Sequence, residues 1–228
     1  MSAATSWLQD YGASLAAFAL FALCHSVGAQ EPFKQALGRW TSPFLVTHFW
    51  RLLYCALSLW ALYAGIASLH WLHHPQHDHW LIEYPPWLWQ LLTLLHLLSV
   101  LLFYIAFLQS NYLEFLGLRQ AWIGLRTLSG KPPPTPLRLF GTDRLCVRGI
   151  YGWVRHPMLA AGLLFLLTSG PSLNNLSYTL MYTSYMLIGG YYEERRLLRQ
   201  FGADYTRYRQ RVGAFLPRWS QLRPHRRD

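Results

Sequence analysis

Long apolar stretches alternate with polar segments along this chain. Windows at roughly 11–29, 48–69 and 87–109 contain few charged residues. Each is long enough to cross the ~30 Å hydrocarbon core of a bilayer as a helix that rises ~1.5 Å per residue. We therefore predict three membrane-spanning helices. The first window lacks the basic segment and cleavage site of a secretory signal, so we expect it to be retained as an anchor.

A fourth apolar block, at roughly 157–192, is too long for one span. The segment SGPSLNN, residues 169–175, interrupts it with turn-forming residues. This interruption predicts a helical hairpin, and with it about five spans in total. A helix from Pro157 to Ser169 covers only ~20 Å, which is short for a span. Pro157 either marks the entry turn of this helix or a kink in a helix that begins further back, near Ile150.

Beyond residue 192 apolar positions recur at helical intervals between arginines, at Leu197, Leu198, Phe201, Tyr205, Tyr208 and Val212. This pattern predicts an amphipathic cytoplasmic helix, which either packs over a site as a lid or lies on the membrane. The expected fold class is all-α: a polytopic helical membrane protein with about five transmembrane helices and a cytoplasmic amphipathic C-terminal helix.

The chain is expected to form a single membrane-embedded domain over residues 1–228. Within it we distinguish an N-terminal three-helix part, a cytoplasmic connection, and a C-terminal part made of the hairpin and the cytoplasmic helix. Their ranges are 1–110, 111–156 and 157–219.

Composition and charge support the membrane assignment. Hydrophobic residues make up 53% of the chain and charged residues 13%, unlike a typical soluble domain. All 20 Lys and Arg residues lie in or beside the first and third connections or after the last span. The positive-inside rule then places the N-terminus outside and the C-terminus in the cytoplasm, in a bacterial inner membrane. The net charge of +10 favours lipid headgroups, so we expect a bilayer and no nucleic acid as partner.

One outer loop is rich in histidine. It contains His70, His73, His74, His77 and His79 around Asp78. Such a cluster is able to hold Zn²⁺ or Cu²⁺. The alternative is a hydrated, proline-broken loop between two spans. Because no second cluster completes a tetrahedral site, we predict no metal.

Two basic and two acidic side chains are expected to meet on the cytoplasmic side. Arg155 and His156 precede Pro157, which suits the first turn of a helix. The other arm of the hairpin ends at Glu193 and Glu194, so the acids emerge on the same membrane face as the bases. Ionisable groups at this depth usually serve a function. The alternative is a snorkelling arginine with interfacial Glu–Arg pairs.

Two segments of the C-terminal half resemble a known family. RGIYGWVRHPM (residues 148–158) and YYEERRLLRQFGADYTRYRQRVGAFLPRW (residues 191–219) resemble the signature of integral-membrane methyltransferases. These include isoprenylcysteine carboxyl methyltransferase and phospholipid methyltransferases. Upstream, HSVGAQEPFK, FWRLLYCALSLW and LEFLGLRQAW are similar to the branch that holds methanethiol S-methyltransferase, NnrU proteins and nurim. The resemblance covers nearly the whole chain.

The resemblance implies an enzyme that binds S-adenosylmethionine under the cytoplasmic leaflet. The family signature contains an Arg-His-Pro element, here called the RHP element, and a pair of acidic residues. Arg155, His156 and Pro157 match the RHP element, and Glu193 and Glu194 match the paired acids. The cofactor's carboxylate suits Arg155 or His156, its amine and ribose suit a glutamate, and its adenine suits an aromatic wall, for which Tyr151 and Trp153 are candidates.

One departure from the family pattern concerns the residues after Pro157. Relatives usually carry tyrosine two residues later and often glycine two further on, where this chain has Leu159 and Ala161. A hydroxyl that normally helps to hold the cofactor is missing. Three consequences are open on sequence grounds: weaker cofactor binding, replacement by a nearby tyrosine, or loss of the activity.

The expected reaction is methyl transfer to a small thiol or another small hydrophobic acceptor. It needs alignment and exclusion of water rather than a covalent nucleophile. A thiol attacks as its thiolate, whose pKa a nearby cation lowers. Arg155, His156 and His25 are therefore the candidate catalytic residues, although His25 also suits a hydrogen bond to a neighbouring helix.

Two rival functions remain open on sequence grounds. The first is an NnrU-like protein without methyl transfer, linked to nitrogen-oxide metabolism or haem-dependent isomerisation, in which His25, His48 and His96 are candidate axial ligands. The second is a nurim-like membrane scaffold whose arginine-rich tail binds lipid or a partner. The sequence indicates neither the identity of the acceptor nor an oligomeric state.

Overall fold

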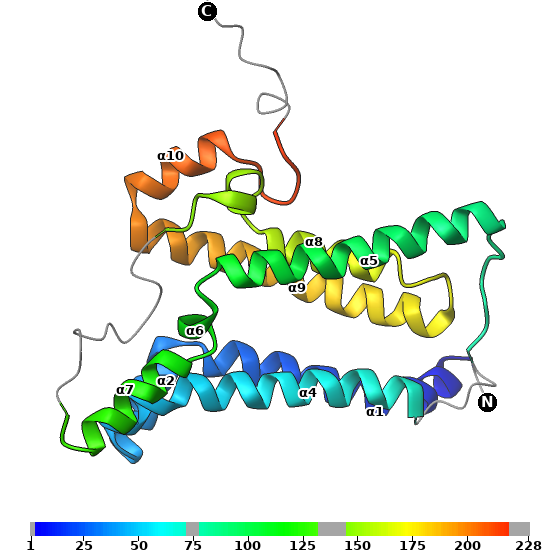
Figure 1. Cartoon of the computed structure of the whole chain (residues 1–228). Helices are drawn as coiled ribbons and strands as arrows, with labels where there is room; N and C mark the ends of the chain where they lie inside the picture. The colour runs from blue at the N-terminus through cyan, green and yellow to red at the C-terminus, as the bar shows by residue number, and fades with distance from the viewer. Residues whose placement is uncertain (1–2, 72–77, 132–144, 219–228) are drawn as a thin grey trace, which may run out of the picture. The chain divides into compact units, whose positions relative to one another are not determined.

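The computed structural model describes residues 3–71, 78–131 and 145–218, and every regular element among them is helical (Figure 1). By its internal contacts the chain divides into two units that interleave along the sequence. Unit 1 comprises Met1–His79 and Tyr112–Asp143, and unit 2 comprises Trp80–Asn111 and Arg144–Asp228. The helical fold class predicted from the sequence is confirmed.

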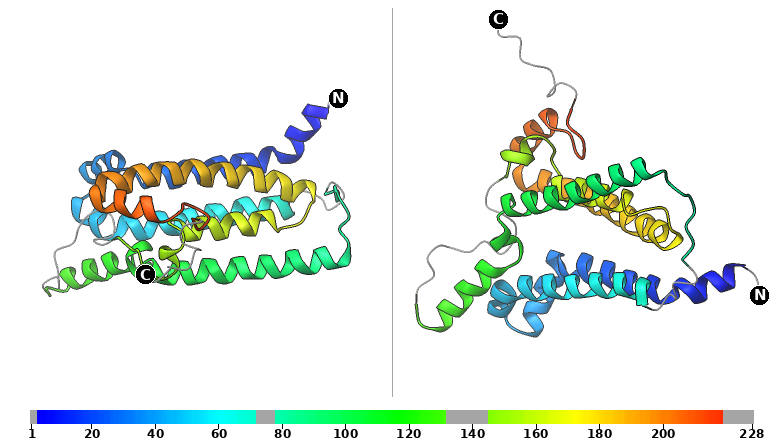
Figure 2. Two further views of the ribbon diagram at one scale, coloured as in Figure 1. Left: turned by 90° about the horizontal axis from the view of Figure 1, so that it is seen from above. Right: turned by 45° about the vertical axis from the view of Figure 1, so that its right-hand side comes forward.

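Unit 1 is built on two long helices, α1 (Ala3–Gly28) and α4 (Arg51–Trp71), which pack side by side in opposite directions (Figures 1 and 2). Short helical elements complete the unit: α2 (Glu31–Trp40), α3 (Pro43–Leu45), the π-helical turn η1 (Val46–Trp50), α6 (Tyr112–Phe115) and α7 (Leu118–Leu128). Helix α7 packs on η1, where Gly124 allows a close approach. A Cβ atom on Gly124 would lie 2.7 Å from the Cβ atom of His48.

Unit 2 contains the site. Its elements are α5 (Pro86–Gln109), the 3₁₀ turn η3 (Gly149–Gly152), α8 (Pro157–Leu167), α9 (Leu173–Phe201) and α10 (Ala203–Arg211). Helix α8 packs against both α5 and α9. Helices α8 and α9 pack against each other across the turn that joins them, which confirms the predicted hairpin. Ser172 caps α9 by accepting a hydrogen bond from the backbone N–H of Asn175.

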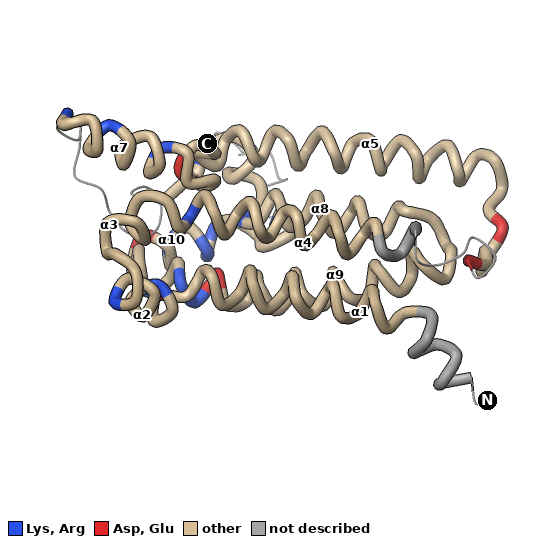
Figure 3. The backbone as a smooth tube through the Cα atoms, turned by 90° about the horizontal axis from the view of Figure 1, so that it is seen from below, with Lys and Arg blue, Asp and Glu red and all other residues tan. Residues whose placement is uncertain are grey.

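Among the described residues three helices are long and apolar enough to span a membrane: Tyr11–Gly28, Pro43–Ala67 and Pro86–Gln109. They confirm the three spans predicted at 11–29, 48–69 and 87–109. Basic residues gather at one end of the helices within each unit, around α2 and α7 in unit 1 and around the end of α9 in unit 2 (Figure 3). The protein is therefore an integral membrane protein.

Of the two starts considered for α8, Pro157 is the observed one and the start near Ile150 is wrong. Residues 149–152 form a separate 3₁₀ turn, and α8 begins at Pro157 and ends at Leu167. Proline disfavours a helical conformation in the residue before it, and the backbone of His156 is non-helical, with φ −120° and ψ 64°. Helix α8 is consequently only about 16 Å long, at about 1.5 Å per residue.

The separate amphipathic helix predicted beyond residue 192 is also wrong in its extent. Helix α9 continues without a break from the apolar block to Phe201. The chain then turns at Gly202, whose φ of 52° suits a glycine, and α10 follows. This turn lets the apolar positions of α10 pack beside the end of α9: Tyr205, Tyr208 and Val212 form a buried cluster with Leu145, Leu197 and Phe201.

Candidate functional site

The segment before α8 is held by the chain that follows α10. The backbone N–H of Arg155 donates to the carbonyl of Gly213 over 2.8 Å, and that of His156 donates to the carbonyl of Ala214 over 3.0 Å. The Phe215 ring lies 5.8 Å, centroid to centroid, from the His156 ring. These contacts fix the backbone of the RHP element from a segment nearly sixty residues later.

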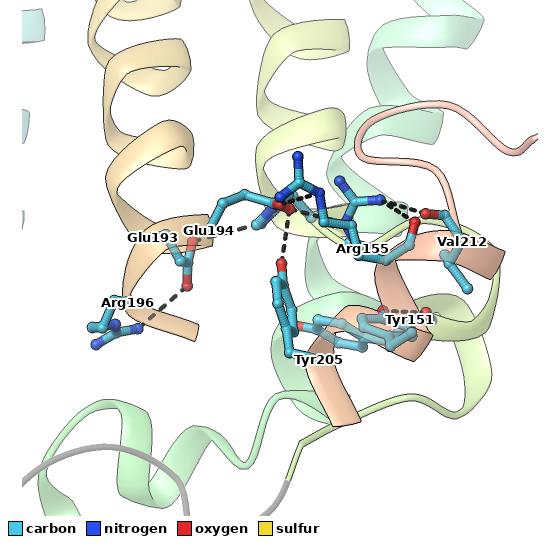
Figure 4. Close-up of polar contacts among 10 residues, drawn as sticks. Tyr151, Arg155, Glu193, Glu194, Arg196, Tyr205 and Val212 are labelled. Atoms are coloured by element: carbon cyan, nitrogen blue, oxygen red, sulfur yellow. Dashed lines mark hydrogen bonds and ion pairs between the residues drawn. The ribbon is translucent and has the colours of Figure 1, made fainter. Parts of the chain in front are cut away.

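One carboxyl oxygen, Oε1 of Glu194, collects three side-chain contacts (Figure 4). Arg155 Nε donates to it over 2.8 Å, the Tyr205 hydroxyl donates over 2.8 Å, and His156 Nε2 lies 2.7 Å away. Tyr205 is fully buried, with 0% of its surface exposed. The glutamate near the end of α9 therefore joins the RHP element to α10.

Further charges surround this centre. His156 Nδ1 lies 3.6 Å from a carboxyl oxygen of Glu193, so the imidazole stands between the two glutamates. Glu193 also pairs with Arg196 over 3.4 Å, and the second oxygen of Glu194, Oε2, lies 3.5 Å from Arg209 Nε. The site is a compact network of alternating charges.

Arg155 also binds main-chain carbonyls at the end of α10. Its Nη1 donates to the carbonyl of Val212 and, over 3.3 Å, to that of Arg209. Tyr151 makes a second connection: its carbonyl accepts a 2.5 Å hydrogen bond from the Tyr208 hydroxyl, and its own hydroxyl donates to the carbonyl of Ala106 in α5. The site is thus tied to both α5 and α10.

The network shifts the pKa values of its members. Burial favours the neutral form of Glu194, but hydrogen bonds from Arg155, Tyr205 and His156 outweigh it and lower the carboxyl pKa to about 2. Burial by itself would lower the pKa of His156. Its hydrogen bonds and charge attraction to Glu193 and Glu194 reverse this effect and raise the pKa above its usual value. At neutral pH the site therefore holds an ionised Glu194, and it favours the protonated form of His156 more than water does.

The convergence of Arg155, His156, Glu193 and Glu194 predicted from the sequence is observed. Pro157 starts α8 directly behind them. What these residues bind or catalyse stays a prediction. Tyr205 and Arg209 were not predicted as site residues. Tyr205 lies in the segment 191–219 that resembles the family signature, which was a signal for it, whereas Arg209 is one of many arginines there.

The position of the missing tyrosine is occupied by apolar packing. Leu159 faces Gly190 of α9: a Cβ atom on Gly190 would lie 3.2 Å from Leu159 Cδ1 and 3.6 Å from Phe215 Cζ. Leu159 and Phe215 thus both pack close to Gly190. An apolar wall adjoins the charged network where a hydroxyl was expected from the resemblance.

The other histidines have local partners. His25 lies in unit 1, with its ring 5.7 Å from Phe21 and 6.3 Å from Tyr54. In the same unit His48 Nδ1 contacts the carbonyl of Phe44, whereas in unit 2 His96 Nδ1 contacts the Thr168 hydroxyl. A catalytic role for His25 and haem ligation by these three histidines stay predictions.

The predicted absence of metal in the histidine-rich loop is not tested. Residues 72–77, with His73, His74 and His77, lie outside the described residues, as does the side chain of His70. In the part of the chain that the structure describes, no three His, Cys, Asp or Glu side chains gather in a metal-binding group.

Comparison with known proteins gives two kinds of match. A sequence model of the family described as NnrU protein matches residues 14–167. Methanethiol S-methyltransferase 2 of Bradyrhizobium diazoefficiens is 33% identical over 214 residues, covering 90% of this chain and 72% of the relative. Methanethiol S-methyltransferase of Mycobacterium tuberculosis is 30% identical, and the match covers 93% of this chain and 78% of the relative. Methanethiol S-methyltransferase of Pseudomonas deceptionensis is 33% identical, and the match covers 87% of this chain and 69% of the relative.

The matches to the three methyltransferases cover so much of this chain that they include the stretch from Arg155 to Glu194, whereas the family match ends at residue 167. No solved structure matches the chain.

Proposed function

Because the chain belongs to the NnrU family, and its matched relatives include methanethiol S-methyltransferases, we propose that it is an integral-membrane methyltransferase. The proposed methyl donor is S-adenosylmethionine. The proposed acceptor is methanethiol or another small thiol or hydrophobic molecule that enters from the bilayer.

The observation that carries this proposal is the network around Glu194. Three groups hold Oε1, while Oε2 has a single 3.5 Å contact to Arg209 among the described residues. A fixed carboxylate with one available oxygen suits the amine or hydroxyl donors of the proposed cofactor. Tyr151 and the exposed Trp153 provide aromatic surface for its adenine in the turn before the RHP element. The residues present therefore fit the group.

The proposed cofactor site is made of Tyr151, His156, Pro157, Glu193 and Glu194, with Arg155 holding Glu194 in place. When bound, S-adenosylmethionine supplies a methyl group on a positively charged sulfur. The protein's part is to orient the acceptor against that group and to exclude water. The apolar wall of Leu159 and Phe215 suits a small hydrophobic acceptor.

A protonated His156 is the proposed source of positive charge on the acceptor side. A cation near a thiol favours the thiolate, which is the attacking form. Arg155 supports this arrangement by holding Glu194, and we keep His25 as the candidate from unit 1. The proton released by the thiol passes to solvent.

The membrane arrangement of the enzyme is part of the same proposal. Helices α8 and α9 add a short and a long span to the three apolar helices, which makes five. The N-terminus then lies outside and the site lies under the cytoplasmic leaflet of a bacterial inner membrane.

The test is binding and turnover by the purified chain in detergent micelles. Calorimetry with S-adenosylmethionine should show saturable binding, and Glu194→Ala should abolish it. Incubation with labelled cofactor and a panel of thiols and lipids should give a labelled volatile thioether. Arg207→Gln is the matched control. Arg207 lies on the neighbouring helix α10 and pairs only with Asp204 among the described residues, so this variant should bind S-adenosylmethionine like the native chain.

An absence of binding heat with the native chain would exclude the proposal. A Soret band in the purified protein would instead favour the haem-dependent alternative. Membrane function that survives neutralisation of Arg155 and both glutamates together would favour a scaffold.

A further inference from the structure

The two oxygens of Glu194 have different surroundings. Oε1 accepts from Arg155 Nε and the Tyr205 hydroxyl and contacts His156 Nε2, all within 2.8 Å. Oε2 lies 3.5 Å from Arg209 Nε, beyond a good hydrogen bond. The first oxygen is thus the structural anchor of the site. The second retains acceptor capacity toward a ligand.

Arg155 is poorly placed to bind a ligand carboxylate. Its side chain is only 8% exposed. Its Nε binds Glu194, and its Nη1 binds the carbonyls of Val212 and Arg209. Among the described residues only Nη2 lacks a hydrogen bond, and a side chain with 8% exposure offers a ligand carboxylate little surface. Arg155 therefore acts as a positioning residue for Glu194.

Arg209 has the opposite properties. Its side chain is 55% exposed, whereas that of Glu194 is 17% exposed. Its backbone carbonyl accepts from Arg155 Nη1, so the main chain that carries it is held against the site. Its guanidinium has five donors in a planar fork, of which Nε faces Glu194 Oε2. The remaining donors suit a bidentate contact with a carboxylate.

A carboxylate oxygen and a guanidinium that lie side by side match the two charges of an α-amino acid. We propose that Glu194 Oε2 and Arg209 form the subsite for the amino-acid end of the ligand: Oε2 accepts from the α-ammonium, and Arg209 binds the α-carboxylate. This inference rests on the proposed methyltransferase function and assigns the carboxylate to a residue of α10.

Two nucleoside probes separate this subsite from the rest of the site. S-adenosylhomocysteine carries the amino-acid end, and 5′-methylthioadenosine lacks it. The full chain in detergent micelles should bind the first probe more tightly than the second. Arg209→Gln should weaken S-adenosylhomocysteine about tenfold or more and leave 5′-methylthioadenosine unchanged, because a charge-assisted bidentate contact is lost only with the first.

Arg207→Gln is the matched control. Arg207 lies on the same helix, is 69% exposed and pairs with Asp204 over 2.5 Å. The substitution removes the same charge from the same helix, so the affinities of both probes should stay at native values. Should Arg209→Gln fail to fold, Arg209→Lys keeps the charge and loses the planar fork. It should weaken S-adenosylhomocysteine selectively, by a smaller factor.

Three results would overturn the subsite. Equal losses in Arg209→Gln and Arg207→Gln would show an effect of net charge alone. Equal weakening of both probes by Arg209→Gln would place Arg209 away from the amino-acid end. In both cases the native chain still binds the nucleosides, so the proposed function stands. If the native chain binds neither probe, the proposed function fails and the subsite with it.

Discussion

A single carboxyl oxygen organises the chemistry of this protein. Glu194 Oε1 joins two residues before α8 and one residue of α10 to its own helix α9. A partly buried carboxylate is costly unless donors surround it, and here three groups do so. The same donors that stabilise the ionised form fix the direction of Oε2. Stability and ligand recognition thus depend on the same few side chains.

The raised pKa of His156 predicts a pH-dependent stability. In the unfolded chain histidine titrates near about 6.5, whereas in the folded protein the two glutamates favour the protonated form. The stabilisation from His156 is complete below that pH and is lost as pH rises through the folded value. Thermal unfolding in micelles should therefore show a midpoint that falls as the pH is raised above about 6.5.

His156→Gln is the control for that measurement. It lacks the titrating ring, so its midpoint should vary less over the same range, from a lower starting value. An identical pH dependence in native and variant protein would assign the effect to another group.

Helix boundaries in unit 2 depend on single residues. Pro157 starts α8, and Gly202 ends α9 with a positive φ. Between these points α9 extends well past the apolar block and carries the glutamates on its last turns. The reversal at Gly202 then directs Tyr205 back toward Glu194. A short turn between two helices therefore completes the site.

In unit 1 the close contact between α7 and the π-helical turn η1 predicts the effect of a small substitution. A Cβ atom on Gly124 would lie 2.7 Å from His48 Cβ and 2.9 Å from Phe49 Cζ. Gly124→Ala should therefore destabilise the protein by about 1 to 3 kcal/mol through overpacking, despite the better helix propensity of alanine. Thermal or denaturant unfolding in micelles measures the difference.

Gly189→Ala in α9 is the comparison. No neighbouring atom lies within 4 Å of a Cβ atom placed there, so helix propensity should dominate and give a gain of up to about 1 kcal/mol. If Gly124→Ala and Gly189→Ala change the free energy of unfolding by the same amount, the close contact between α7 and η1 has no effect on stability.

The basic ends of the helices predict how the whole molecule sits in the bilayer. Lys and Arg gather at one end within each unit (Figure 3), and positively charged segments stay in the cytoplasm. A fluorescent protein fused to the C-terminus should therefore fluoresce in a bacterial host. Alkaline phosphatase fused near Asp78 should be active.

The reversed pair of fusions tests the same orientation. Phosphatase at the C-terminus should be inactive, and the fluorescent protein near Asp78 should be dark. Active phosphatase at the C-terminus would place the Glu194 network outside the cytoplasm and contradict the proposed arrangement.

Much of the fold of this protein was predictable from local sequence patterns. Apolar windows of sufficient length specified the helical class and the three long spans, because burial in hydrocarbon requires nearly continuous apolar sequence. The turn at residues 169–175 specified the hairpin, and the hairpin brought Glu193 and Glu194 to the RHP element.

Only the tertiary structure decided the partners of each charge. Arg155 and Glu194 are 39 residues apart, and Arg155 and Val212 are 57 apart; helical periodicity does not specify contacts over such distances. The length of α9, the return of α10 and the unequal surroundings of the two Glu194 oxygens follow from packing between elements. Periodic patterns determine which face of a helix is buried, but three-dimensional packing determines which donor meets which acceptor there.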